Sequence, residues 1–333
     1  MQFWSAVGAI GRLMMRVGVV ILLFVAFQLW GTGLSTARAQ DKLTKEFDTQ
    51  IAEFAENSPT PSTTAPEVAP TKQSAATAPP NQPVPQLGDP IARLTMKAID
   101  SDFIIVQGVD LKWLQEGPGH FPQTPLPGQP GNAAIAGHRT TYQAPFNRID
   151  ELVPGDTITV ATLQGTFTYI VDAQSDPKDG ARTGYKIISP NDMSILDQES
   201  GTNRLTLMAC HPKFSAAQRI VVTATLDSNP APATPIPTYE GVTSDASLDA
   251  LAGGDSSAWP GAILWSLLTA AAWFGVWWLA RFWTPSLQRT NAAPVSGLKD
   301  WRFLATYAIG TPVVLVLMFI DFTTITRLLP ASY

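Results

Sequence analysis

Three long runs of apolar residues stand out in the hydrophobic pattern of this chain. One lies near the N-terminus, "VGVVILLFVAFQLW" (17–30), and two lie near the C-terminus, "AILWSLLTAAAWFGVWWLA" (262–280) and "FLATYAIGTPVVLVLMFI" (303–320). The two C-terminal runs are long enough to cross a bilayer as helices, and the apolar residues at 13–15 lengthen the first run enough to do the same. We therefore predict three transmembrane helices.

The first run has two interpretations. Arg12 and Arg16 before an apolar stretch, and the small residues "ARA" at 37–39 after it, are also typical of a cleaved signal peptide. Because the stretch is long enough to span, we favour an uncleaved signal-anchor.

Basic residues set the expected orientation. The loop between the second and third runs contains four basic residues and one acidic residue: Arg281, Arg289, Lys299 and Arg302 against Asp300. Positively charged loops stay in the cytoplasm, so this loop and the N-terminal arginines are both expected there. Three spans then place residues 31–258 outside, and we predict a multi-pass protein of the cell membrane with an extracellular domain.

The residues between the first and second apolar runs show three kinds of sequence pattern: a helical periodicity, Pro-rich stretches and a folded domain. Apolar residues recur at helical spacing within 41–57, at Leu43, Phe47, Ile51 and Phe54, and predict a short helix. The stretches 58–90 and 227–257 are rich in Pro, Thr, Ala or Ser and read as extended spacers. The expected parts are the anchor (1–40), the helix and spacer (41–90), a folded domain (91–228), a linker (229–258) and a transmembrane hairpin (259–333).

The folded domain has a strand pattern. Short runs rich in Val, Ile, Thr and aromatic residues alternate with Gly, Pro and Asp. The expected strands lie at 102–108, 131–138, 156–163, 165–173, 203–210 and 218–226, with a helical turn within 142–152. Many short strands at this spacing predict a mainly β fold that closes into a barrel.

Composition narrows the possible functions. The net charge is −5, charged residues make up 15% of the chain, and no basic stripe is present, so nucleic acid is not an expected partner. A single cysteine, Cys210, excludes an internal disulfide.

Cys210 lies in "LTLMACHPKFSAAQR" (205–219), which predicts a strand, a loop and a returning strand. Strand alternation sends Leu205, Leu207 and Ala209 to one face and Thr206, Met208 and Cys210 to the other. The hairpin is expected to bring Arg219 back beside Cys210. A second strand, "AIAGH", ends at His138 after a glycine that provides space.

A cysteine, a histidine and an arginine at neighbouring strand ends can carry out acyl transfer. A thiolate attacks a carbonyl, the imidazole moves protons, and the always-charged guanidinium stabilises the oxyanion. The residues alone leave other interpretations open, because a lone cysteine is more often a buried small residue and His138 could simply end a strand. A metal site at Cys210 and His211 is disfavoured, since too few further ligands follow in any known spacing.

A family resemblance favours the catalytic interpretation. The strand "TLMAC", the Arg that follows it closely and the upstream "GH" resemble the signature of sortases. The stretches 117–156 and 210–219 are similar to class E sortases of actinobacteria, and the resemblance covers roughly residues 90–226.

This resemblance implies an eight-stranded sortase β-barrel with Cys210 as nucleophile, His138 as general acid and base, and Arg219 as oxyanion and substrate clamp. It implies cleavage of a C-terminal Leu-Pro-x-Thr-Gly or Leu-Ala-x-Thr-Gly sorting signal between Thr and Gly, without a cofactor or metal. Surface proteins with such signals are the expected substrates, and a peptidoglycan precursor or a pilin amine is the expected acceptor. Substrate contacts are expected from the residues near the groove and the nucleophile, His120, Thr206, Met208 and His211.

Two departures from the sortase pattern leave alternative functions open. Ala209 replaces the family's Thr before the cysteine, with its side chain on the opposite face from Cys210. The C-terminal membrane hairpin resembles the C-terminal span of class C pilin polymerases, yet "DPI" at 89–91 lacks the aromatic residue of their lid. The alternatives are a pilin polymerase with the same chemistry and a catalytically silent scaffold; the spacing of an L,D-transpeptidase is absent.

Overall fold

The computed structural model describes residues 2–57, 82–175, 182–199, 201–240, 256–282 and 301–328. Most of the predicted Pro-rich spacer (58–81), the later part of the linker (241–255) and most of the basic loop (283–300) lie outside the described residues. The chain divides into two compact units, one built from residues 1–28 and 255–329, the other mainly from residues 29–254.

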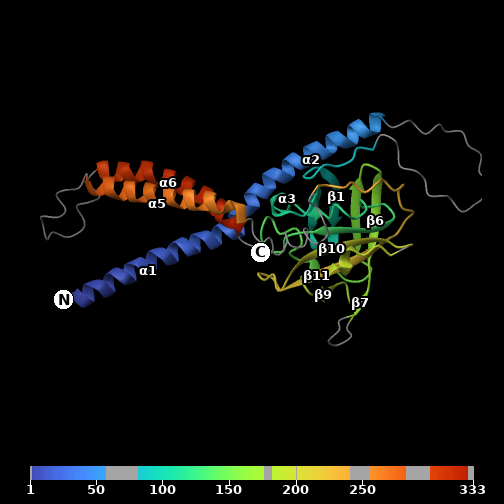
Figure 1. The fold of residues 1–333 in the computed structure, drawn as a ribbon, viewed down its shortest axis with the longest axis horizontal. Coiled ribbons are helices and arrows are strands. Elements are labelled where there is room, and N and C mark those ends of the chain that lie inside the picture. Colours follow the sequence, from blue (N-terminus) through green and yellow to red (C-terminus); the bar gives the residue numbers. More distant parts are fainter. Residues whose placement is uncertain are drawn as a thin grey trace, which may run out of the picture. The chain divides into compact units, whose positions relative to one another are not determined.

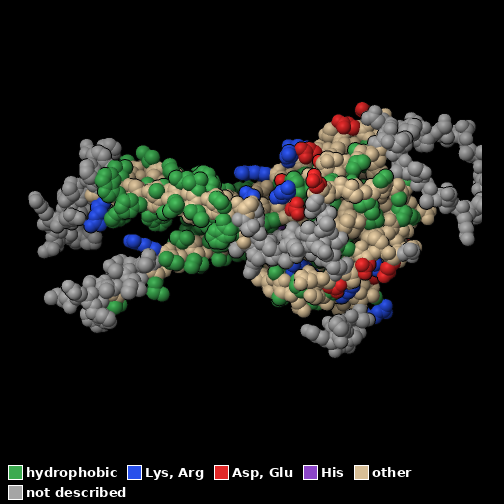
Figure 2. Space-filling view, viewed as in Figure 1, with side chains coloured by type: hydrophobic (Ala, Val, Ile, Leu, Met, Phe, Trp, Pro, Cys, Tyr) green, Lys and Arg blue, Asp and Glu red, His purple; other side chains and the backbone are tan. Residues whose placement is uncertain are grey.

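The first unit is helical. It contains α1 (Gln2–Ala26), the short 3-10 helix η5 (Ser256–Ala258), α5 (Trp259–Phe282) and α6 (Trp301–Leu328). Phe24 meets Phe322 edge to face at 5.1 Å, and the Ser266 hydroxyl donates to the Asp321 carboxylate at 2.7 Å. Hydrophobic side chains cover the visible surface of α5 and α6 (Figure 2).

Three helical stretches are long and apolar enough to cross a membrane: Met14–Glu56, Trp259–Arg281 and Leu304–Leu328. The three predicted candidate spans are therefore confirmed. The first stretch runs on from α1 through a π-helical turn, η1 (Phe27–Gly31), into α2 (Thr32–Asn57). The helix predicted at 41–57 thus begins earlier than the apolar periodicity alone indicated.

The second unit contains a mainly β domain (Figure 1). Its strands are β1 (Pro90–Met96), β2 (Ser101–Gln107), β3 (Gly119–His120), β4 (Gly131–Ala136), β5 (Thr157–Thr162), β6 (Gly165–Val171), β9 (Lys186–Ile188), β10 (Asn203–His211) and β11 (Gln218–Leu226). The two short strands β7 (Gln174–Ser175) and β8 (Arg182–Thr183) form a separate pair, and short helices occur at α3 (Leu111–Leu114), η2 (Lys97–Ile99), η3 (Ile149–Glu151) and η4 (Met193–Leu196).

The sheet closes on itself. Neighbouring strands follow the order β10-β4-β3-β2-β1-β5-β6-β11, and β11 pairs again with β10. The predicted eight-stranded closed barrel is confirmed. β9 lies outside this ring and pairs with the first half of β11, whereas β6 pairs with its last three residues. The sequence pattern did not predict β1, β3 or β9.

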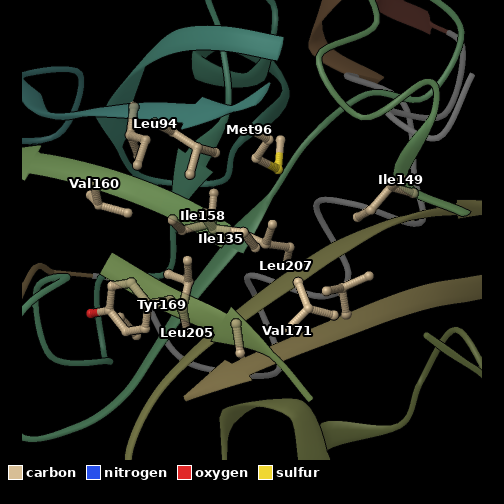
Figure 3. Packing of buried hydrophobic residues seen from close by; sticks show 14 of the residues in the cluster. Leu94, Met96, Ile135, Ile149, Ile158, Val160, Tyr169, Val171, Leu205 and Leu207 are labelled. Atoms are coloured by element: carbon tan, nitrogen blue, oxygen red, sulfur yellow. The ribbon is translucent and has the colours of Figure 1, made fainter. Parts of the chain in front are cut away.

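The barrel interior holds the main hydrophobic core (Figure 3). Leu205, Leu207 and Ala209 point into this core, while Met208 joins a second cluster on the other side of the strand. The predicted alternation along β10 is therefore confirmed. Ala209 fills an interior position in the barrel and does not share the face of Cys210.

The first residues of the predicted linker pack against the barrel. Ala231 is buried in the core, and its backbone N–H donates to Gly128 O at 2.7 Å. Further along, Gln107 Nε2 donates to the Tyr239 hydroxyl, which donates to Pro85 O. Residues 229–240 therefore extend the barrel domain before the linker continues.

Candidate active site

Two strand pairings bring three of the predicted residues together. β4 and β10 are parallel, with Ala136 opposite Met208, and Gly137 N donates to Met208 O at 3.0 Å. His138, two residues after β4, therefore lies at the level of Cys210, the last residue but one of β10. On the other side of β10, Cys210 lies directly opposite Arg219 of the antiparallel strand β11. His138, Cys210 and Arg219 thus come from three adjacent strands, and all three are buried.

The backbone before His138 leaves no room for a side chain. A Cβ on Gly137 would lie 2.6 Å from the ring of Phe146, far inside van der Waals contact. Phe146 in turn donates its backbone N–H to His138 O at 3.1 Å. Glycine at 137 therefore lets the loop after His138 fold back onto the strand end, as the sequence indicated.

Two opposing effects act on the Cys210 thiol. Burial raises its pKa, because the thiolate loses solvation, while the positive charges of Arg219 and, more weakly, Arg139 lower it. Burial is the larger effect, so the resting group is the thiol. A nucleophilic role for Cys210 would then require a neighbouring base to take its proton, which is the role expected of His138.

Arg139 is a site residue that the sequence analysis missed. Its side chain is buried, forms a 2.9 Å ion pair with Asp150, and donates to Cys210 O at 3.2 Å. Its Nη1 also lies 3.0 Å from Nδ1 of His211. The guanidinium therefore ties the end of β10 to the loop that follows β4. Its position directly after His138 was the signal available in the sequence.

Tyr142 is a second missed residue. Its ring lies 4.7 Å from the His138 ring, centroid to centroid, with the two planes tilted by 38°. Tyr142, Gln143 and Ala144 all have left-handed backbone angles, with φ of 53°, 60° and 46°. Residues other than glycine rarely adopt this backbone conformation, and such strained residues are enriched at functional sites.

The four residues expected to contact substrate have different surroundings. Thr206 is buried and donates to Asn132 Oδ1 at 2.7 Å, and Met208 packs in the cluster that includes Phe121. His211 is half-buried next to Cys210, against Arg139. Substrate contact by these three side chains stays a prediction.

His120 is more deeply buried than a residue that lines a substrate groove would be. Its ring is fully buried, with Nδ1 2.8 Å from Gln107 Oε1 and Nε2 2.9 Å from Pro125 O. Burial lowers its pKa to about 4. These contacts fix the start of the loop that runs from 120 to 130, so any effect of His120 on substrate is expected to pass through that loop.

A buried cysteine next to a histidine and an arginine, at one end of a closed β-barrel, is the arrangement of a cysteine acyl-transfer enzyme. Comparison with known proteins finds a domain that is similar to part of this chain. Residues 94–227 match the model of the sortase domain. This stretch of the chain is therefore similar to the domain of sortases, which are cysteine transpeptidases.

Two individual sortases are similar to this chain. The chain is 29% identical to sortase SrtE1 of Streptomyces coelicolor over 228 residues, covering 64% of this chain and 55% of the relative. It is 30% identical to sortase D of Bacillus subtilis over 128 residues, covering 38% of this chain and 58% of the relative. The chain thus spans a little over half the length of these two relatives.

Among solved structures, the chain is similar to a crystal structure titled sortase E1 from Streptomyces coelicolor with a tripeptide in the active site. That match has 29% identity and a TM-score of 0.37, and it covers 46% of this chain and 94% of the other. A structure of SrtF sortase from Corynebacterium diphtheriae matches with 28% identity and a TM-score of 0.40, covering 51% and 98%.

Proposed function

We propose that this protein is a membrane-anchored cysteine transpeptidase that attaches surface proteins to the cell wall. The observation that carries the proposal is the position of Cys210 between His138 and Arg219 on three adjacent strands of a sortase domain. The substrate is a protein with a C-terminal Leu-Ala-x-Thr-Gly or Leu-Pro-x-Thr-Gly signal, cleaved between Thr and Gly.

The proposed reaction has two halves. His138 takes the proton of Cys210, and the thiolate sulfur attacks the carbonyl carbon of the Thr–Gly bond, with Arg219 stabilising the oxyanion. The tetrahedral intermediate collapses to a thioester, and the Gly amine leaves with the proton held by His138. An acceptor amine then attacks the thioester and gives a proton to His138, the new amide forms, and the thiolate is released.

The membrane arrangement supports this setting. Three helices are long and apolar enough to span, and basic residues flank the first span and the connection between the last two. The positive-inside rule then supports a position of the barrel on the extracellular side, where wall precursors and exported proteins meet. Class E character, with its preference for Ala at the second signal position, is supported by the similarity to SrtE1 of Streptomyces coelicolor.

The test uses the full chain in detergent micelles with two quenched fluorescent peptides, one containing Leu-Ala-x-Thr-Gly and the other Leu-Pro-x-Thr-Gly. We expect cleavage between Thr and Gly, a thioacyl adduct on Cys210 by mass spectrometry, and transfer to an added amine. Cys210→Ala and Arg219→Gln should abolish all three. Arg204→Gln, which removes a charge from the same strand as Cys210, is the matched control and should retain activity.

The same experiment separates the alternatives. A pilin polymerase would transfer the acyl group preferentially to a lysine side chain in a folded or peptide acceptor over a small wall-type amine. A silent scaffold would give no adduct with either peptide, although its Cys210 would still react with a thiol reagent. The second outcome would refute the proposed function.

A further inference from the structure

Helix α2 completes one edge of the barrel. The two-residue strand β3 pairs with β2 only at Val106 and Gln107, so among the described strands none pairs with Ile104 on that side. The side chain of Gln40 takes that place, because its Nε2 donates to Ile104 O at 3.0 Å and its Oε1 accepts from Ile104 N at 2.7 Å. One side-chain amide thus supplies both hydrogen bonds of a missing strand.

Apolar and polar contacts hold successive turns of α2 against the same edge. Leu43 and Phe47 are buried in a cluster with Ile104 and Val106. Gln40 Nε2 also donates to Glu116 O at 2.8 Å. Along the barrel side, α2 is therefore fixed over its middle turns (Figure 1).

The first turns of α2 reach the loop that follows His138. The Thr36 hydroxyl donates to Gln115 O at 2.8 Å. One turn earlier, the Thr32 hydroxyl oxygen accepts the backbone N–H of Tyr142 at 3.2 Å, and Thr32 is itself buried. Gly33 lies beside Gln143, since a Cβ at Gly33 would be 3.7 Å from that side chain. The start of α2 therefore borders the strained residues 142–144.

A strained loop persists only where its surroundings hold it. Within the loop, Ala144 N donates to Thr141 O at 2.8 Å. From outside, Thr32 holds the backbone of Tyr142. The result is a buried Tyr142 ring packed against the His138 imidazole, with the two ring planes tilted by 38°. An aromatic ring face restricts the rotation of the imidazole and favours its protonated form, which is the form that donates to a leaving amine.

We propose that α2 is part of the active site: it holds Tyr142 against His138, and Tyr142 is a positioning residue for the catalytic imidazole. The inference rests on the proposed function. It assigns a role to a helix that lies outside the matched sortase domain, residues 94–227. The predicted separation of 41–90 from the catalytic domain would then not hold for the helix.

The first experiment measures kcat and KM for peptide cleavage by the full chain in micelles, with substitutions at position 142. Tyr142→Phe keeps the aromatic ring beside His138 and should retain activity within about twofold. Tyr142→Leu keeps bulk without an aromatic face and should lower kcat about tenfold with little change in KM, because the imidazole is misplaced while the substrate still binds. Equal activity of the Phe and Leu variants would overturn the role of the ring.

The second experiment tests the action of α2. Thr32→Val removes the hydroxyl that accepts from Tyr142 N–H and should lower kcat in the same way as Tyr142→Leu. Thr32→Ser keeps a hydroxyl and should have a kcat close to that of the wild type. Thr49→Val is the matched control, because the Thr49 hydroxyl is exposed and donates to Lys45 O of its own helix. If Thr32→Val leaves kcat unchanged, α2 is not part of the site.

Two controls separate the possible failures. A melting temperature close to that of the wild type shows that each variant is folded. A variant with a lowered melting temperature is replaced by Gln40→Glu, whose side chain still accepts from Ile104 N but no longer donates to Ile104 O. If the wild-type chain cleaves neither peptide, the proposed function fails. If the wild type cleaves and the variants match it, only this inference fails.

Discussion

The buried His120 predicts a loss of barrel stability in mild acid. Its pKa lies at about 4 in the folded protein against an ordinary 6.5, because burial disfavours the imidazolium. Between these two pH values the unfolded chain binds a proton that the folded chain does not, so the free energy of unfolding falls as the pH drops from 6.5 to 4. At about 1.4 kcal/mol per pH unit, the full loss is about 3 kcal/mol, a large part of the 5–15 kcal/mol typical of a domain.

The single cysteine provides the assay. Cys210 is only 8% exposed in the folded barrel, so an increase in its rate of reaction with a thiol reagent in urea reports unfolding of that unit. The reagent 4,4′-dithiodipyridine reacts with thiols in acid, which allows titrations from pH 7 down to pH 4 on the full chain in micelles. We expect His120→Gln to be less stable at pH 7 but to lose about 3 kcal/mol less than the wild type across this range.

The test compares how the free energy of unfolding depends on pH in the wild type and in His120→Gln. All other titratable groups are the same in the two proteins, so a difference between them is due to His120. If wild type and His120→Gln lose the same free energy of unfolding between pH 7 and pH 4, then His120 is not the residue that takes up the proton. The buried imidazole would then not be the neutral, hydrogen-bonded group that its contacts with Gln107 and Pro125 indicate.

Three other substitutions test the site and the core. Arg219→Gln should slow the alkylation of Cys210 by iodoacetamide at neutral pH, by roughly tenfold for each unit that the thiol pKa rises. The reason is that the positive charge of Arg219 lowers the pKa of the Cys210 thiol more than that of Arg139 does. An unchanged alkylation rate would contradict this. Gly137→Ala should abolish peptide cleavage, since the methyl group would meet the Phe146 ring at 2.6 Å; activity near that of the wild type would show that the loop can yield. Leu207→Ala should cost about 2–5 kcal/mol in urea unfolding followed by thiol labelling, because a fully buried core side chain is lost.

Much of the site was predictable because it depends on local patterns. Alternation along 205–210 determined which side chains face the barrel core, and the length of the loop after Cys210 determined that Arg219 returns beside it. The parallel pairing that brings His138 to Cys210 needed the family resemblance, since no local pattern shows which strands become neighbours.

The missed features depend on tertiary contacts. The stripe of Leu43 and Phe47 predicted a helix, but periodicity does not show which surface it meets, here the open edge of β2. The strand β3 is two residues long, too short for a strand pattern to emerge. Arg139 resembled an ordinary loop residue in the sequence, and only the folded chain places it against Cys210 O.

The order of the strands has a consequence for synthesis. Cys210 receives one neighbour from β4 and the other from β11, the last strand of the closed ring. A nascent chain released before residue 218 holds the thiol without Arg219, and the ring is still open. The surroundings of Cys210 are therefore complete only when the last strand of the ring has paired.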